Sequence, residues 1–249
     1  MKRIVLILMI LLGAWTAKTQ SIRDTSLLLN MFSFHLSGHI PGGDIADRYG
    51  MNMGVGGTYW LKFQSNWLLT ADFSFFSGRD FKEEHIFDNL SDESGIFINI
   101  YGEVGEAAFF ERGFFASVGG GKILPVIGPN PNSGIIIRGT AGLLQYKTLI
   151  HQDGRDIPYL NGDYKKGYDY LTNGFGISQF IGYLHLDGDQ PINFYAGLEF
   201  HQAWTRNRRD WNFDIMGPDP SLRSDFLFGI RFGWIFPVTR NTTDTFYYY

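Results

Sequence analysis

Long stretches of this sequence alternate, residue by residue, between apolar and polar side chains. From Phe32 to Ile40 the chain reads FSFHLSGHI, so one face carries Phe32, Phe34, Leu36 and Ile40, and the other carries hydroxyls and imidazoles. A period of two is the side-chain repeat of a β-strand. The segment therefore predicts a strand whose two faces meet two different environments.

The same alternation recurs along the chain, in windows that are mostly about 10 to 15 residues long. Strands of globular proteins usually have about 5 or 6 residues, whereas a tilted transmembrane strand needs about 9 to 11. The windows therefore favour strands that cross a membrane. Besides the first, they cover residues 51–63, 66–76, 96–104, 113–124, 135–150, 173–186, 192–204 and 226–236.

The apolar faces of these windows are strongly aromatic, and the opposite faces carry charges deep inside the windows. Arg231, for example, is flanked by Ile230 and Phe232 in the run FLFGIRFGWIF. A barrel in a membrane places its apolar face against lipid and its polar face in the lumen. The sequence thus predicts an all-β fold, a single antiparallel transmembrane β-barrel. A secreted or periplasmic two-sheet sandwich, whose apolar faces pack inward, is the alternative.

The expected connections fall into two groups, as in outer-membrane barrels with short periplasmic turns and long extracellular loops. Short turns are expected near Gln64, at Glu111 to Gly113 and at Asp187 to Gln190. Long polar loops are expected at Gly78 to Gly95, Pro125 to Ser133, His151 to Thr172 and Arg206 to Leu222.

The nine windows are an odd number, whereas single-chain bacterial barrels have even numbers of strands. A further strand at Asp156 to Leu160, after the hairpin signal Asp153-Gly154, would make ten. If one window instead belongs to a loop, eight remain. The prediction is a barrel of 8 to 10 strands, with ten favoured over eight.

The N-terminal residues resemble a secretory signal peptide. Lys2 and Arg3 precede an apolar run of 12 residues, Ile4 to Trp15, which is shorter than the about 20 needed to span a bilayer. We predict a cleaved signal peptide over residues 1–19 and a barrel domain over 20–249 in the cell outer membrane; an uncleaved anchor is the alternative. The chain has no Cys, hence no disulfide, and no basic stripe that would indicate nucleic acid as a partner.

Polar residues on the predicted inner faces are the candidates for chemistry. His35 and His39 share a face, but four residues of strand span about 13 Å, so they cannot share one metal ion, and His201 could reach only one of them. The sequence predicts no metal and no cofactor, but a structural salt-bridge network in a narrow lumen, with a polar pore as the alternative. Its predicted members are His35, His39, Asp72, Glu103, Arg138, Glu199, His201 and Arg231.

No pattern in the sequence predicts an enzyme. The motif GxSxG is absent, and no Ser, His and Asp are placed together by spacing. The runs GVGG (54–57) and GGGK (119–122) fall inside strand windows, so they indicate crowded strands and not phosphate-binding loops.

Two loops, Tyr164 to Gly174 and Trp204 to Asp225, mix aromatic residues with charges of both signs. Tyr, Trp and Arg are favoured at protein interfaces. The loops are therefore predicted either to bind a partner or to form an ordered cap over the barrel mouth. The candidate interaction residues are Tyr164, Tyr168, Tyr170, Arg206, Arg208, Arg209 and Trp211.

Five motifs together resemble a family of small outer-membrane barrels from Bacteroidota, with an OmpA- or OmpX-like architecture. They are PGGDIADRYG (41–50), SNW (65–67), ERGF (111–114), NSG (132–134) and GDYKKGYDYLTNG (162–174), and they span nearly the whole mature chain. The narrow predicted lumen and the contact-rich loops predict a non-enzymatic accessory or scaffold subunit of an outer-membrane complex. The resemblance implies a BAM-type or type 9 secretion complex, and the expected partners are outer-membrane lipid and other outer-membrane proteins. A small channel or ligand-binding barrel is the alternative, and an outer-membrane enzyme ranks last.

Overall fold

The computed structural model describes residues 25–87, 90, 97–99, 101–105, 107–152, 157, 160, 162–187 and 193–238. The predicted signal peptide, residues 1–19, lies outside the described residues. So does most of the candidate strand at Asp156 to Leu160, of which only Ile157 and Leu160 are described.

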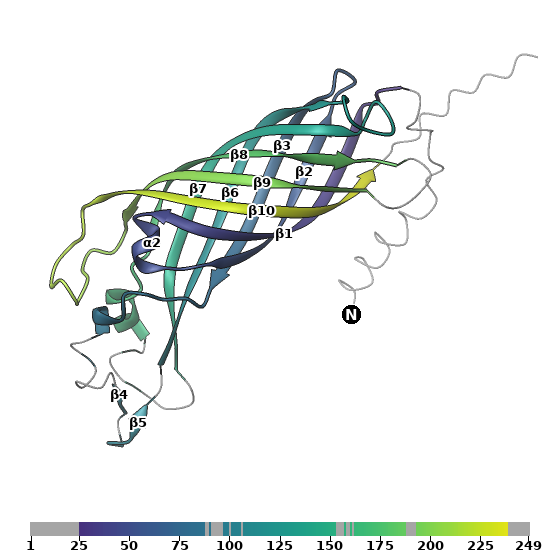
Figure 1. Ribbon diagram of the computed structural model, residues 1–249. Coiled ribbons are helices and arrows are strands. Elements are labelled where there is room, and N and C mark those ends of the chain that lie inside the picture. Colours follow the sequence, from purple (N-terminus) through teal and green to yellow (C-terminus); the bar gives the residue numbers. More distant parts are fainter. Residues whose placement is uncertain are drawn as a thin grey trace, which may run out of the picture.

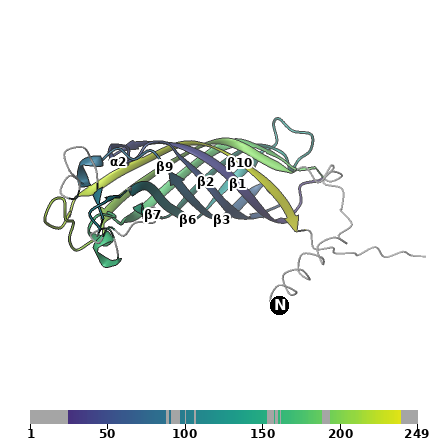
Figure 2. The same cartoon turned by 90° about the horizontal axis from the view of Figure 1, so that it is seen from below.

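Eight antiparallel strands form a closed barrel in the order β1-β2-β3-β6-β7-β8-β9-β10, and the strands run obliquely around it (Figures 1 and 2). They are β1 (Leu29–Gly43), β2 (Asn52–Lys62), β3 (Trp67–Gly78), β6 (Ala107–Leu124), β7 (Gly134–Gln152), β8 (Thr172–His185), β9 (Phe194–Asn207) and β10 (Leu222–Val238).

The ring closes between the first and the last strand. β1 pairs with β10 from Asn30 opposite Val238 to Gly43 opposite Asp225. The first strand therefore begins, and the last strand ends, at one rim, which we call the terminal rim; the opposite end is the loop rim. The prediction of an all-β antiparallel barrel with 8 to 10 strands is confirmed, at eight.

The preference for ten strands was wrong, and window 96–104 shows why. It forms only β4 (Phe97–Ile98) and β5 (Val104–Gly105), which pair with each other in the β3–β6 connection. The Asn99 side-chain oxygen accepts hydrogen bonds from the backbone N–H groups of Tyr101 and Glu103, each 2.9 Å long. This local turn interrupts the alternation before a strand of membrane length can form.

Two predicted connections also lie elsewhere. Glu111 to Gly113 is not a turn but part of β6, where Glu111 stands between Gly78 of β3 and Thr148 of β7. Gly113 is needed there because an added Cβ would lie 2.4 Å from the ring of Phe76. The long connection Pro125 to Ser133 lies at the terminal rim, beside the short β2–β3 turn.

The two faces of the wall have opposite chemistry. On β10, Phe228, Ile230, Phe232 and Trp234 are 48 to 66% exposed, whereas Arg231 is 2% exposed. Apolar side chains on the outside and charges on the inside are the arrangement of a barrel wall in lipid. Among the described residues, no helix combines the length and apolar character that a bilayer crossing requires.

Three buried apolar clusters follow one another along the molecule. The terminal cluster fills the barrel at the terminal rim and contains Leu29, Met31, Trp60, Leu68, Ile123, Ile136, Phe180, Leu184, Leu186, Tyr195 and Ile235. The mouth cluster fills it toward the loop rim and contains Ile45, Tyr49, Phe76, Phe115, Leu144, Tyr146, Ala203 and Leu227. The cap cluster lies beyond that rim and contains Ile86, Phe87, Phe97, Ile150, Ile157, Leu160, Tyr168 and Tyr170.

Short helical turns and a strand extension build the loop end. The helix α2 (Ile45–Arg48) follows β1 and inserts Ile45 into the mouth cluster. The 3₁₀ turns η2 (Glu84–Phe87) and η4 (Gly162–Gly167) belong to the loops that form the cap. β6 and β7 run on past the barrel as a two-stranded ribbon toward this region (Figure 1).

Candidate functional site

A layer of polar side chains occupies the barrel interior between the terminal and mouth clusters. β1, which contains the run FSFHLSGHI, contributes Ser33, His35, Ser37 and His39, all at most 5% exposed. Their neighbours in the chain face outward, as the alternation predicted. We call this polar layer the candidate site.

The charged centre of the layer joins strands that lie on different sides of the barrel. Arg231 Nη1 lies 2.9 Å from Asp72 Oδ2, and Arg231 Nε lies 2.6 Å from Glu199 Oε2. Arg138 Nη1 is 3.8 Å from Asp72 Oδ2, and its guanidinium stacks over Trp60, 5.0 Å from the ring centroid. Two guanidinium groups and two carboxylates therefore balance each other in the middle of the lumen.

Hydroxyl groups complete this network. His35 Nε2 lies 2.7 Å from Ser74 Oγ, and Thr58 Oγ1 donates to Asp72 Oδ2 over 2.5 Å. A Ser beside a His has the composition of a nucleophile and base. Arg231 Nη2, however, also donates to Ser74 Oγ, and both Ser74 and His35 are at most 3% exposed. We therefore interpret the pair as a structural bond.

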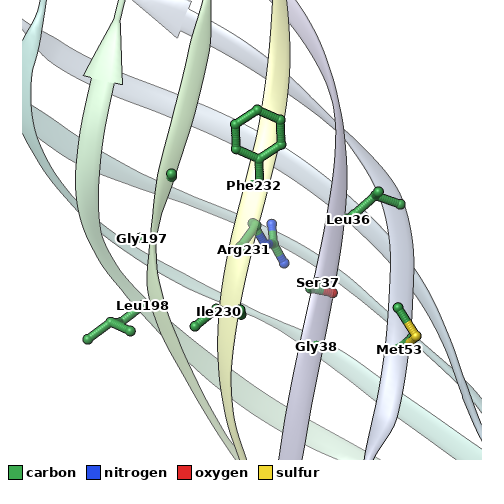
Figure 3. Close-up of a pocket in the computed structure, with 10 residues that line it drawn as sticks. Leu36, Ser37, Gly38, Met53, Gly197, Leu198, Ile230, Arg231 and Phe232 are labelled. Carbon is green, nitrogen blue, oxygen red and sulfur yellow. The ribbon is translucent and has the colours of Figure 1, made fainter.

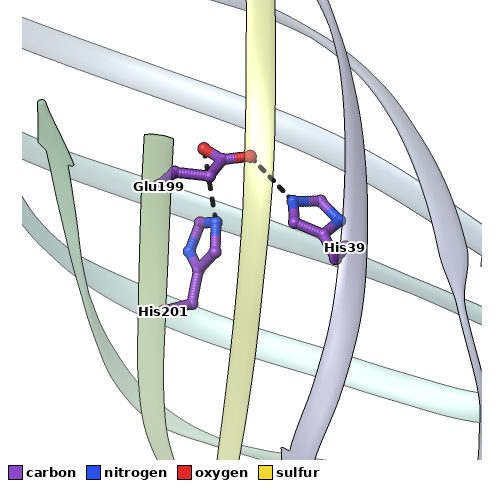
Figure 4. Close-up of side chains that lie close together, drawn as sticks. All are labelled: His39, Glu199 and His201. Carbon is purple, nitrogen blue, oxygen red and sulfur yellow. Dashed lines mark hydrogen bonds and ion pairs between the residues drawn. The ribbon is translucent and has the colours of Figure 1, made fainter. Parts of the chain in front are cut away.

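His39, Glu199 and His201 form a second group toward the loop rim (Figure 4). His39 Nε2 is 2.7 Å from Glu199 Oε1, and His201 Nε2 is 3.5 Å from Glu199 Oε2. Gly229 of β10 stands between His39 of β1 and Glu199 of β9 in the register. An added Cβ at Gly229 would lie 2.5 Å from the His39 ring, so this glycine opens the path between them.

Two buried carboxylates were missed as lumen residues. Glu111 accepts a hydrogen bond from Asn52 Nδ2 over 2.8 Å, and Asp225 accepts from Tyr146 and Thr205. Glu111 was placed in a turn and Asp225 in a loop. Glu111, Gly113 and Ser117 are separated by even numbers of residues and so share one face of β6. This spacing is the signal that could have placed Glu111 inside the barrel.

One predicted member of the network lies elsewhere. Glu103 is exposed in the small β4–β5 hairpin outside the barrel, so the prediction that it faces the lumen was wrong. The other seven predicted members all have side chains in the interior layer. The run GVGG is part of β2, as predicted; an added Cβ at Gly56 would lie 2.6 Å from His35 Nε2.

The predicted interaction residues divide into cap-forming and exposed groups. Tyr168 and Tyr170 are buried in the cap cluster. Arg209 makes a two-pronged ion pair with Asp169, with N–O distances of 2.7 and 2.6 Å. Burial, together with the hydrogen bond and charge of Asp214, raises the pKa of Tyr170. These residues hold the two loops together.

The remaining predicted interaction residues face outward. Arg206 is exposed, and Arg208 is exposed while donating to Asn173 Oδ1 over 2.6 Å. Tyr164 and Trp211 are about half exposed or more, and Ile215 and Met216 beside Trp211 are exposed too. An apolar surface therefore lies on the β9–β10 loop above the barrel.

The lipid-facing wall is hollowed where small residues replace bulky ones (Figure 3). A hollow of about 630 Å³ lies over Gly38 and Gly197 and is bordered by Leu36, Met53 and Ile230. A neighbouring hollow of about 540 Å³ lies over Gly139 and Gly229. Both open outward, toward the lipid.

The fold and its interior define a class: a small outer-membrane β-barrel with a filled lumen. A closed eight-stranded wall with an apolar outside and a charged, packed inside belongs in lipid, and the class places the protein in the cell outer membrane.

Comparisons with known proteins give only distant likenesses. No family model and no curated protein matches the sequence. The attachment invasion locus protein Ail of Yersinia pestis is similar in structure, with a TM-score of 0.44, 9% identity, and coverage of 84% of this chain and 99% of that one. Neisserial surface protein A has a TM-score of 0.38 and 8% identity, with coverage of 82% of this chain and 96% of that one. OprG from Pseudomonas aeruginosa has a TM-score of 0.39 and 11% identity, with coverage of 86% and 99%.

Because these identities and TM-scores are low, the class rests on the barrel itself. The resemblance to barrels of Bacteroidota, and the link to a BAM-type or type 9 secretion complex, stay predictions.

Proposed function

We propose that the protein is a non-enzymatic accessory or scaffold subunit of an outer-membrane protein complex. The observation that carries this proposal is the packed interior. Ion pairs in the middle of the lumen are covered on one side by the terminal cluster and on the other by the mouth cluster. With its interior filled, the barrel acts through its surface.

The surface of the cap has the chemistry of a protein interface. Trp211, Ile215 and Met216 expose 49, 53 and 69% of their area on one loop. Exposed apolar groups of this kind, with aromatic residues and Arg nearby, favour a protein partner.

The exposed residues are also held in place. Phe213 packs on Tyr168 with ring centroids 5.2 Å apart, and Arg209 is fixed on Asp169. A surface ordered before binding loses less conformational entropy when a partner docks. The cap therefore supports docking of a partner better than a flexible loop would.

Gentle detergent extraction followed by native mass determination tests the proposal. A photo-crosslinking residue at Ile215 should give a discrete cross-linked product in intact cells. The matched position is Phe73, which is equally exposed but faces lipid on the wall. A lone monomer at every detergent concentration, together with no product from Ile215, would contradict the scaffold role.

Conductance in a planar bilayer separates the scaffold from the small channel. The filled lumen supports the expectation of no steady current. A stable unitary current that changes after Arg231→Gln would favour the channel.

A further inference from the structure

The buried group His39, Glu199 and His201 has a composition that the network of ion pairs does not explain. We propose that these three residues bind a first-row transition-metal dication, with Zn²⁺ preferred. Each residue offers one ligand atom, and the three atoms lie within 4.8 Å of one another. Two imidazoles and one carboxylate are a donor set that zinc uses in proteins. The proposal concerns the interior and does not depend on the scaffold role.

The hydrogen bonds of His39 orient its ring for metal binding. Asn52 Nδ2 donates to Glu111 Oε2, so Asn52 Oδ1 is the atom that faces His39 Nδ1, 2.8 Å away. His39 Nδ1 must then carry the proton, because an amide oxygen only accepts. The second nitrogen, Nε2, points at Glu199. An imidazole fixed through one nitrogen by an outer hydrogen bond is the usual state of a metal-binding histidine.

The Nε2 atom of His39 lies 2.7 Å from Glu199 Oε1, and this contact needs a positive charge between the two atoms. A lone pair on Nε2 facing a carboxylate oxygen would be repulsive. A second proton on the ring or a metal ion would each remove the repulsion. His201 favours the metal ion over the second proton, because it places a second imidazole nitrogen 3.5 Å from the other oxygen of the same carboxylate.

The spacing requires only small side-chain adjustments. Ligand atoms about 2.0 to 2.2 Å from a tetrahedral zinc ion lie about 3.3 to 3.6 Å apart. The 3.5 Å contact of His201 with Glu199 lies in this range, and the 2.7 Å contact of His39 is shorter, so the His39 ring must move outward to admit the ion. Arg231 Nε stays on Glu199 Oε2 as an outer contact that orients the carboxylate.

The test is metal binding by the full chain during folding, since the site is enclosed. The protein is refolded from urea into detergent micelles with Co²⁺, desalted, and its metal content and visible spectrum are measured. We expect about one ion per chain, the absorption of four-coordinate Co²⁺ with three protein ligands and one water molecule, and displacement by Zn²⁺.

Matched variants locate the ion. His39→Gln and His201→Gln should lose the bound ion, whereas His35→Gln, the same change four residues earlier on the same face of β1, should keep it. Asn52→Ala should weaken affinity about 10- to 100-fold, because the His39 tautomer is no longer fixed. Each variant is first checked for folding by the different gel mobility of its unboiled form.

If a ligand variant does not fold, X-ray absorption of the zinc-loaded parent protein counts the ligands instead. Two imidazoles and a carboxylate support the proposal. It is overturned if the desalted parent holds no metal, if His39→Gln and His201→Gln fold and retain as much as the parent, or if the zinc has only oxygen ligands. A protonated His39 on Glu199 would then explain the group.

Discussion

The polar layer in the lumen and the cap cluster above it obey opposite rules of burial. In the layer, Arg231, Asp72 and Glu199 are buried while Ile230 and Phe232 of the same wall are exposed. In the cap, Ile86 and Phe87 are buried, as in a soluble domain. One chain therefore follows a different rule of burial where its surroundings change from lipid to water.

The physical reason lies in the solvent on the outside. Apolar side chains gain little by leaving lipid, so those of the wall stay outside, and the layer between the two apolar clusters holds charges that pair with each other. In water the hydrophobic effect drives apolar groups together, and Phe87 stacks on Phe109 with ring centroids 3.9 Å apart.

Removing the central cation should break the polar layer. Arg231→Gln leaves Asp72 and Glu199 buried without their main partner, and loss of one member of a buried pair costs about 3 to 5 kcal/mol. We expect a lower urea midpoint, measured by the loss of the faster-migrating folded band. Arg231→Gln combined with Asp72→Asn should recover much of the loss. Equal midpoints for the parent and the single variant would show that the ion pairs do not hold the barrel.

The same substitution should destabilise the wall far more than the cap. Ile230→Arg places a charge in the lipid-facing wall, which costs about 2 to 4 kcal/mol near the midplane. Ile215→Arg, at a comparably exposed position on the cap, should change stability by less than about 0.5 kcal/mol. Folding yield into lipid vesicles compares them. If both variants fold equally well, the outer face of β10 does not lie against lipid.

A small cavity in the cap should loosen the cap alone. Ile86→Val removes one buried methylene and should cost about 0.5 to 1.5 kcal/mol of local stability. Hydrogen exchange should rise in the cap backbone and stay unchanged in the barrel strands. Ile215→Val, at an exposed site, serves as the control. Faster exchange throughout the barrel would mean that the two regions unfold together.

Alkaline pH should affect the cap before the polar layer. Burial and the neighbouring Asp214 raise the pKa of Tyr170, whereas a tyrosine in an unfolded loop ionises near pH 10, about its ordinary value. The stabilisation is therefore complete below about pH 10 and is lost as pH rises toward the folded pKa. Proteolysis by an alkaline-tolerant protease should cut the cap loops faster above that pH. Tyr170→Phe should flatten this dependence, and an unchanged profile would contradict the role of Tyr170.

Much of the wall could be predicted from the sequence. Each side chain's face follows from its parity within a strand, so His35, Asp72, Arg138 and Arg231 were placed inside by local pattern alone. The prediction for Glu103 was wrong because Asn99 forms a turn that the alternation does not reveal. The lumen position of Glu111 was missed because Gly113, two residues later, suggested a turn, although this glycine only makes room for Phe76.

The cap was predicted less well, because its core comes from separate loops. Tyr168 and Tyr170 have the same residue type as Tyr164, but only the first two are buried. Their burial depends on packing against Ile86 and Phe87, about 80 residues earlier in the chain. No periodicity links these segments.

The alternation in eight of the nine windows is sufficient to predict that they cross the membrane and which of their side chains face lipid or the lumen, because a period of two is a local property of the backbone. The tertiary structure alone decided the number of strands and the meeting of His39 with Glu199. That meeting requires the ring to close through β10, so that Gly229 stands between the two residues and leaves space for the imidazole. Register and closure arise between strands far apart in the chain, and the local alternation carries no information about them.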